Sequence, residues 1–173
     1  MDGKKQSDIV IGVISDTHNH LYPDVKELLS GVDHIIHAGD VCTGAVLSEL
    51  HDIAPVTLAR GNSDMRSWAS FVPMEVEVEL GGLRILVGHI VGPLRARVAT
   101  RSANSRDNTE KHIDIVVSGH THKALMEEEN GVLYLNPGSA GPRSFGRPRT
   151  MAFLRIPPTG AGDFSANIVV LED

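Results

Sequence analysis

Short apolar segments, each followed by a polar motif, are the feature that most restricts how this 173-residue chain can fold. Five such segments are rich in β-branched residues and cover residues 9–14, 34–37, 56–59, 85–87 and 113–117. Continuous apolar runs of this length are typical of strands that are buried on both faces. We therefore expect a sheet that other layers of the protein cover on both sides.

The segments between the first strands indicate how these strands are connected. Residues 24–30 and 45–51 carry apolar side chains at helical spacing. Strand, helix and strand in alternation are typical of right-handed crossovers between parallel strands. The first half of the chain is therefore predicted to form a largely parallel sheet with helices packed against it.

The second half of the chain has the pattern of antiparallel hairpins. The sequence MEVEVEL, from Met74 onward, alternates with period two, and Gly81-Gly82 and Asn130-Gly131 are typical hairpin turns. Two further strands are predicted on either side of the turn PPTGAGD. Between the hairpins, residues 93–112 are predicted to form a short amphipathic helix followed by a loop.

Composition restricts the protein class without identifying a function. The length predicts one domain over residues 1–173, and 41% hydrophobic with 22% charged residues is ordinary globular composition. The net charge of −6 and the lack of a long basic tract disfavour a stable nucleic-acid partner. Cys42 is the single cysteine, so no intrachain disulfide forms, and the apolar start is too short for a signal peptide or membrane span. These features favour a cytoplasmic protein without membrane contact.

Three polar motifs follow the first three predicted strands. SDTH contains Asp16 and His18, HAGD contains Asp40, and RGNSD contains Asn62. Because ligands bind beyond the carboxyl ends of the strands in an α/β sheet, these side chains are expected to meet there. Taken alone, each motif has a simpler interpretation, such as an ordinary Gly-Asn turn.

Two histidine motifs follow later strands and complete a candidate metal site. VGH contains His89, and SGHTH contains His120 and His122. Two carboxylates, one amide and four imidazoles, without thiolates, suit manganese, iron, zinc or nickel better than magnesium, calcium or copper(I). Seven ligands with one shared carboxylate would form two sites with room for water, as in a two-metal hydrolase.

The ordered set DTH, GD, GN, GH and GHTH resembles the calcineurin-like metallophosphoesterases. The later sequence GHTHK…NPGS resembles the small bacterial phosphodiesterase branch of that family and the related retromer scaffolding subunit. The similarity spans about residues 8–156. It implies an α/β fold, a four-layer α/β/β/α sandwich of two stacked mixed sheets flanked by helices, with the site at the strand ends.

The resemblance also implies roles for individual residues. One ion would be held by Asp16, His18, Asp40 and His122, and the other by Asp40, Asn62, His89 and His120. A hydroxide bridging the ions would attack phosphorus, with Asp40, Asn62 and His120 as the residues closest to the chemistry. Two divalent ions are expected. Manganese is the leading candidate, and nickel, zinc and iron are the alternatives.

Ser63 is the main departure from the family pattern, because many members carry a histidine there that can protonate the leaving group. A hydroxyl is a poor acid at neutral pH, so phosphodiesters with good leaving groups are the expected substrates. His20 could replace the missing acid, or it is an ordinary exposed histidine. Asp64 has no histidine to orient and is expected to cap the turn.

The glycine- and proline-rich segment after NPGS carries Arg143, Arg147 and Arg149, which either recognise substrate phosphate or belong to a solvated connection. Arg143 is thus a second candidate for a catalytic role beside His20. The predicted function is hydrolysis of a small phosphodiester or nucleotide-like substrate. A non-catalytic scaffold and a phosphomonoesterase are the alternatives, and assembly into a homo-oligomer is left open.

Overall fold

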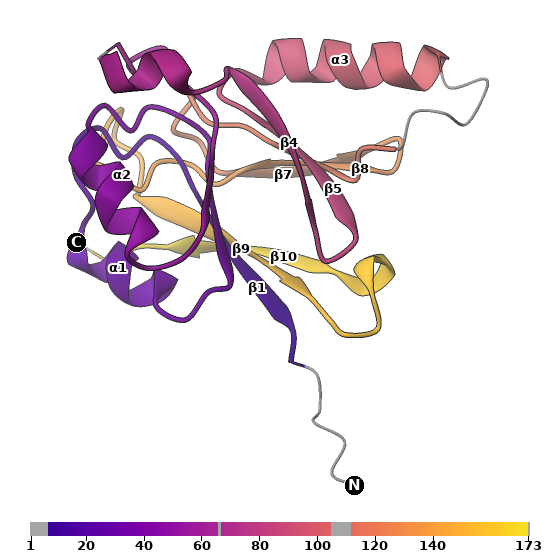
Figure 1. Ribbon diagram of the computed structural model, residues 1–173, viewed down its shortest axis with the longest axis horizontal. Coiled ribbons are helices and arrows are strands. Elements are labelled where there is room, and N and C mark those ends of the chain that lie inside the picture. The colour runs from indigo at the N-terminus through magenta and orange to yellow at the C-terminus, as the bar shows by residue number, and fades with distance from the viewer. Residues whose placement is uncertain (1–6, 66, 105–111, 173) are drawn as a thin grey trace, which may run out of the picture.

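The computed structural model describes residues 7–65, 67–104 and 112–172 and has four layers (Figure 1). The first sheet contains, from edge to edge, β10 (Ser165–Val170), β9 (Thr150–Ile156), β1 (Ile9–Ile14), β2 (His34–His37) and β3 (Val56–Leu58). The second sheet contains β4 (Glu75–Leu80), β5 (Leu83–Gly88), β6 (Ile115–Val117), β8 (Val132–Asn136) and β7 (Leu125–Glu129).

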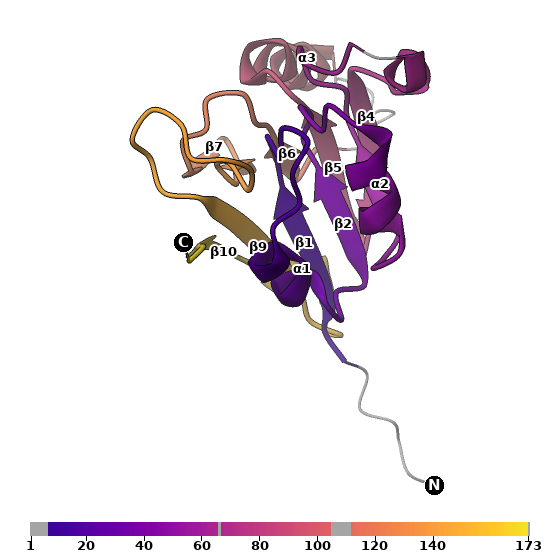
Figure 2. The same cartoon turned by 90° about the vertical axis from the view of Figure 1, so that its left-hand side faces the viewer.

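The first three strands of the chain form the parallel part of the first sheet. β1, β2 and β3 are parallel neighbours, connected by helices α1 (Pro23–Leu29) and α2 (Gly44–His51). Pro23 lies at the start of α1, where its fixed φ suits the helix and its missing N–H costs nothing. Leu29 and Leu50, which are fully buried, pack the two helices against the outer face of this sheet (Figure 2).

The second sheet combines parallel and antiparallel pairs. β5, β6 and β8 are parallel, while β4 and β7 pair antiparallel at the two edges. Helix α3 (Val91–Asn104) covers the outer face of this sheet, with Leu94 packed in a cluster with Leu86 and Val116. Arg101 of α3 also donates hydrogen bonds to the carboxylate of Glu77 on β4.

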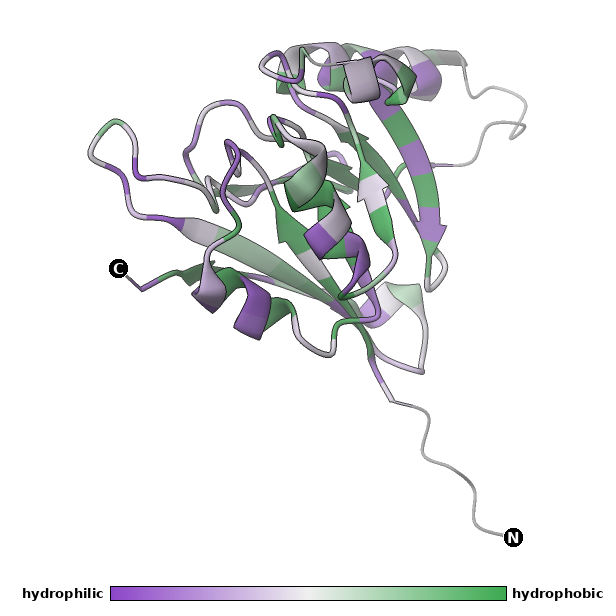
Figure 3. Cartoon of the chain, turned by 60° about the vertical axis from the view of Figure 1, so that its left-hand side comes forward, coloured by the Kyte–Doolittle hydropathy of each residue, from purple (hydrophilic) through white to green (hydrophobic). Residues whose placement is uncertain are grey.

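The main core lies between the two sheets. Ile11, Val13, Ile85, Val117 and Leu154 are fully buried there, and the strands that carry them appear as the apolar part of the molecule in Figure 3. Burying one such side chain contributes about 1.5–3 kcal/mol. Stacking the sheets therefore fixes the positions of the strand ends at which the polar motifs begin.

The predicted four-layer fold is confirmed, as are the parallel first strands and the hairpins. Both predicted hairpin turns have positive φ at their two central residues, 57° and 85° for Gly81-Gly82 and 53° and 76° for Asn130-Gly131. The strand predicted over 113–117 begins at Ile115, just after Asp114, whose carboxylate accepts the N–H of Arg84. Helix α3 agrees with the predicted helix, and the loop predicted after it falls largely on residues 105–111, outside the described residues. Within the described part of the chain, no helix has the length and apolar character needed to cross a membrane.

Candidate metal centre

The loops after β1 and β2 place Asp16 and Asp40 side by side. The backbone N–H of Asp16 donates to the carbonyl of Gly39 at 3.0 Å, and that of His18 donates to the carbonyl of Asp40 at 3.0 Å. Since the two strands are parallel neighbours, their carboxyl ends bring both loops to the same edge. The side chains of Asp16 and Asp40 are 0% and 3% exposed, so both carboxylates lie beneath the surface.

Five of the seven predicted ligands have a left-handed backbone conformation. Their φ angles are 55° for Asp16, 44° for His18, 59° for Asp40, 69° for His120 and 53° for His122. Non-glycine residues seldom adopt this conformation, which costs on the order of 1 kcal/mol each and concentrates at functional sites. These loops therefore adopt backbone conformations of higher energy, which set the directions of the five side chains.

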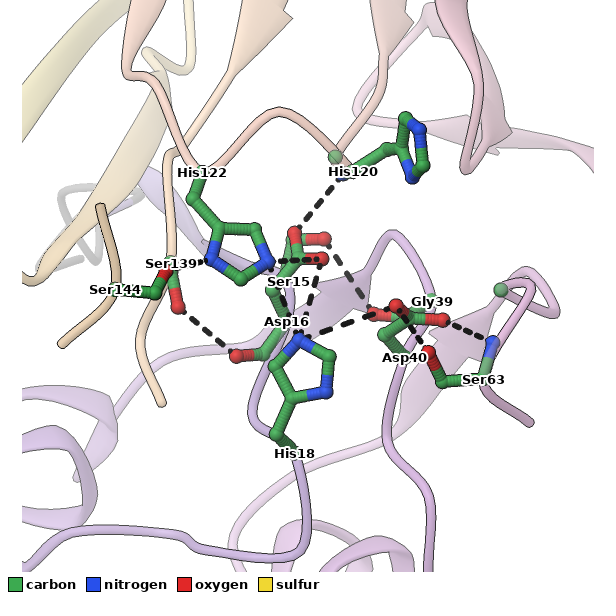
Figure 4. A network of polar contacts seen from close by, with 12 residues as sticks. Ser15, Asp16, His18, Gly39, Asp40, Ser63, His120, His122, Ser139 and Ser144 are labelled. Carbon is green, nitrogen blue, oxygen red and sulfur yellow. Dashed lines mark hydrogen bonds and ion pairs between the residues drawn. The ribbon is translucent and has the colours of Figure 1, made fainter. Parts of the chain in front are cut away.

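A first group of possible ligands consists of Asp16, His18 and His122 (Figure 4). Nε2 of His122 is 3.2 Å from Oδ1 of Asp16 and 3.2 Å from Nε2 of His18, while His18 Nε2 is 3.9 Å from the same Asp16 oxygen. Two imidazoles and a carboxylate converging in this way present three ligand atoms to one cation.

A second group consists of Asp16, Asp40 and His89. Nε2 of His89 is 3.4 Å from Oδ2 of Asp40 and 4.0 Å from Oδ1 of Asp16. The other ring nitrogen of His89 lies 2.7 Å from the carbonyl oxygen of Ala38, so it carries the proton and leaves Nε2 free to bind a cation. Oδ2 of Asp40 is also 3.9 Å from His18, so both carboxylates lie between the two groups.

Two buried atoms of these groups test whether a metal would fit. Among the described residues, Asp16 Oδ1 and His89 Nε2 are buried without a hydrogen-bond partner. Leaving such a group unsatisfied costs about 1–3 kcal/mol. Divalent cations bound by the two groups would satisfy both atoms, and the mixed oxygen and nitrogen donors suit a borderline metal. The residues present therefore fit a metal site.

The pKa shifts of Asp40 and His122 favour cation binding, whereas those of Asp16 and His89 oppose it. Burial raises the pKa of the Asp16 carboxyl, whereas the pKa of Asp40 is lowered: burial alone would raise it, but the neighbouring His89 and the hydrogen bonds from Ser63 outweigh that effect. Burial lowers the pKa of His122, which favours the neutral imidazole that binds metals. Burial alone would lower the pKa of His89, but the two aspartates outweigh burial and raise it. A cation at this histidine would therefore compete with a proton.

His120 and Asn62 lie beside these two groups. The His120 ring is exposed and packs edge-on against the His89 ring with centroids 5.1 Å apart, while its backbone N–H donates to Oδ2 of Asp16 at 3.0 Å. Figure 4 shows its ring directed away from Asp16. Asn62 is exposed, and its amide nitrogen donates to the Ser63 hydroxyl at 3.4 Å. Their roles as ligands remain predictions.

Ser63 makes a contact that the sequence did not reveal. It binds the Asp40 carboxylate. Its backbone N–H donates to Oδ1 at 2.8 Å and its hydroxyl donates to Oδ2 at 2.9 Å. Gly61 precedes this turn, and a Cβ there would collide with the same carboxylate. The missing histidine is therefore replaced by a residue that holds a candidate ligand.

Asp64 does more than cap its own turn. Its carboxylate accepts the N–H of Gly61 at 2.8 Å, as a turn cap would, but also those of Asp40 at 3.0 Å and Cys42 at 2.7 Å. Asp64 is 5% exposed. This one side chain ties the loop after β3 to the loop after β2, a contact between segments more than 20 residues apart that local sequence patterns could not predict.

Two further side chains support the predicted ligands. The hydroxyl of Ser144 contacts Nδ1 of His122, which leaves Nε2 facing the first group (Figure 4). His37 is fully buried, contacts the Thr17 hydroxyl at 3.0 Å, and accepts the N–H of Gly39 at 3.2 Å. Burial lowers the pKa of His37 to about 3, so it is neutral and links the loops after β1 and β2. No local sequence pattern identifies Ser144 as a partner of His122.

The remaining candidates lie in different surroundings. His20 is exposed and packs edge-on against the Tyr22 ring, with centroids 4.1 Å apart. Arg143 is exposed, and the guanidinium of Arg147 donates to the carbonyl of Thr121. Arg149 is 5% exposed and binds both carboxylate oxygens of Asp24 at 3.0 Å, so it fastens the loop to α1 rather than meeting a substrate.

Comparison with known proteins adds independent findings. A probable metallophosphoesterase of Methanocaldococcus jannaschii is 36% identical over 140 residues, covering 76% of this chain and 68% of that protein. A phosphodiesterase of the same organism is 28% identical over 145 residues, covering 74% and 82% of the two chains. The solved structure of vacuolar protein sorting 29 from Cryptosporidium parvum has a TM-score of 0.71 at 21% identity, covering 97% and 100%, and supports the fold.

The calcineurin-like phosphoesterase superfamily domain matches residues 9–157. This range contains every residue of the two convergent groups and both sheets except β10. The fold, the convergent carboxylates and imidazoles, and the relatives agree with one another. The chain belongs to the calcineurin-like phosphoesterase superfamily.

Proposed function

We propose that this protein is a phosphodiesterase that depends on two divalent metal ions, with manganese as the leading candidate. The observation that carries the proposal is the pair of buried, unsatisfied atoms, Asp16 Oδ1 and His89 Nε2, within two groups that share Asp16. A fold that needed no cation would gain stability by pairing or removing them. The phosphodiesterase named among its relatives supports this class of reaction.

The proposed ligand sets follow the family pattern. Asp16, His18, Asp40 and His122 would hold one ion, and Asp40, Asn62, His89 and His120 the other. When bound, the ions would supply activated water and stabilise negative charge on the phosphoryl group. For Asn62 and His120 to join the second set, their exposed side chains would have to turn toward Asp40.

The chain's own residues restrict the substrate. Ser63 Oγ already donates its proton to Asp40 at 2.9 Å, so it is not placed to protonate a departing alkoxide. We therefore expect diesters whose leaving groups depart without a proton, and a small or nucleotide-like substrate. His20 is the remaining candidate for a replacement acid, and unchanged turnover of substrates with poor leaving groups in His20→Ala would eliminate it.

A non-catalytic scaffold is the alternative from a different class, and a phosphomonoesterase is the alternative within the family. The scaffold, which could itself bind metal, is less well supported because a scaffold can lose metal ligands with little penalty, whereas all seven ligand positions are filled in this sequence. The monoesterase is less well supported because alkyl monoesters benefit most from the proton donor that Ser63 does not supply.

Metal restoration separates the three functions. Purified protein would be stripped with a chelator and assayed on bis-p-nitrophenyl phosphate and p-nitrophenyl phosphate, with manganese, nickel, zinc or magnesium restored singly. We expect manganese to restore faster turnover of the diester. Faster turnover of the monoester would favour a monoesterase, and metal binding by calorimetry without turnover of either substrate would favour a scaffold.

A further inference from the structure

The two flanks of the metal centre differ in chemistry. Beside His89, a cavity of about 360 Å³ is lined mainly by apolar side chains, among them Met74, Ile90 and Leu94, with the charged residues Arg60 and Glu75 also in its wall. Met74 is 63% exposed and Ile90 is 44% exposed, so large apolar side chains face solvent next to a polar centre. Because a cavity of ~150 Å³ can hold a benzene ring, this one has room for an aryl or branched alkyl group.

The opposite flank begins at His122 and is cationic. A cavity of about 390 Å³ is lined there by His122, Lys123, Arg147 and Thr150, and no carboxylate lines it. The guanidinium of Arg147 is held by the carbonyl of Thr121 and lies over the Phe145 ring, 5.7 Å from its centroid. This fixed geometry lowers the entropy that binding an anion would cost.

Thr150 supplies a second observation on the cationic flank. It is 4% exposed, and its hydroxyl is buried without a hydrogen-bond partner among the described residues. A buried hydroxyl can donate to an anionic oxygen and so recover the energy that its isolation costs. The cationic flank therefore has two positive charges, and one residue of its wall carries an unpaired hydroxyl.

We propose that the substrate is a phosphodiester with two unlike ester groups, an apolar one in the His89 cavity and an anionic one in the His122 cavity. This inference rests on the proposed function. A diester phosphorus carries two ester oxygens that diverge from it, and His89 and His122 belong to the two ligand groups that share Asp16. A phosphorus held over Asp16 would direct one substituent toward each cavity.

Binding of non-hydrolysable analogues tests the anionic half even if the protein catalyses nothing. Benzylphosphinates whose second carbon substituent is a 2-carboxyethyl, propyl or choline-like 2-(trimethylammonio)ethyl group have no ester bond to hydrolyse and differ mainly in the charge of that substituent. By calorimetry with manganese-loaded protein, we expect the carboxyethyl compound to bind about fivefold more tightly than the propyl compound, and the choline compound most weakly. Equal affinities for all three would overturn the anionic half.

Charge reversal on that flank gives the matched controls. Lys123→Glu should abolish or invert the order of affinities, while Arg155→Glu, which makes the same charge change at the far end of β9, should retain it. Identical effects of the two variants would attribute the preference to overall charge and overturn the proposal.

The apolar half has its own variant and control. Met74→Glu should weaken binding of the benzyl analogues about tenfold, whereas Met65→Glu, at an 86% exposed methionine that does not line the cavity, should change it less than twofold. Unchanged affinity in Met74→Glu would overturn this half.

Turnover of the corresponding p-nitrophenyl diesters separates this inference from the proposed function. Selective binding without turnover would refute the phosphodiesterase and leave the two-flank site intact. Turnover of all three diesters with equal kcat/KM would support the phosphodiesterase and refute the two-flank site.

Discussion

The two halves of the metal centre come from different sheets and are built differently. The carboxylate half, after β1 and β2, is buried, and backbone hydrogen bonds and the Asp64 side chain tie its loops together. The histidine half, after β6, has His120 exposed and His122 only partly buried. The carboxylates are thus preset by the fold, while the histidines depend on a few contacts from neighbouring loops. Substitutions in the first half should therefore have larger effects on both metal binding and stability.

The largest effect is expected from Asp16→Asn, because Asp16 belongs to both ligand groups. Loss of a buried metal ligand should exceed the 10–100-fold typical of supporting residues, so we expect diesterase activity to fall by more than about 100-fold. His120→Ala, which removes one exposed ring, should cost less. Equal losses in the two variants would contradict the difference between the halves.

Although Asp16→Asn should lower activity, it should not lower the folding stability of the metal-free protein. Burial raises the folded-state pKa of Asp16, so at neutral pH its carboxylate costs stability, and this cost appears as pH rises through that pKa. Asn removes the charge. In chelator-treated protein Tm should stay equal or rise, and added manganese should no longer raise it. A wild-type response to manganese would count against Asp16 as a ligand.

Asp64 tests what makes the carboxylate half rigid. Asp64→Ala would leave the buried N–H groups of Gly61, Asp40 and Cys42 without their acceptor, at a cost of about 3 kcal/mol in the free energy of unfolding. Asp64→Asn keeps one acceptor oxygen and should cost about half as much. Denaturant unfolding would measure both, and a change below about 0.5 kcal/mol in the alanine variant would show that the loops are held by other contacts.

These variants also separate what the sequence could predict from what it could not. The strand ends, and the Asp and His side chains that come together beyond them, were predictable, because apolar runs and the polar motifs are local in the sequence. The bonds of Asp64 to the Asp40 loop and of Ser144 to His122 join segments more than 20 residues apart. Arg149 looked like a phosphate ligand because its guanidinium suits anions, but the anion it meets is Asp24 of this chain. Only the packed fold decides among such partners.

Ser144 tests the dependence of the histidine half on a neighbouring loop. Ser144→Ala removes the hydroxyl that contacts Nδ1 of His122 and frees the ring to rotate. We expect manganese affinity to fall about tenfold with little change in folding stability, and Ser144→Thr, which keeps the hydroxyl, to restore most of it. Calorimetric titration measures the affinity. Equal affinities of wild-type and Ser144→Ala protein would show that His122 is oriented without this contact.

Ser63 should give the smallest effect, because its contact with Asp40 is duplicated. Ser63→Ala loses the hydroxyl bond to Oδ2 at 2.9 Å but keeps the backbone N–H bond to Oδ1 at 2.8 Å. We expect turnover of p-nitrophenyl diesters to change by less than about fivefold, since one neutral hydrogen bond contributes roughly 1 kcal/mol.

If Ser63 only positions Asp40, Ser63→Ala should reduce turnover equally for good and poor leaving groups. If Ser63 donated a proton, the loss would grow as the pKa of the leaving group rises. A series of aryl diesters that spans leaving-group pKa measures this slope, and a steeper slope in Ser63→Ala would return the serine to the role of acid.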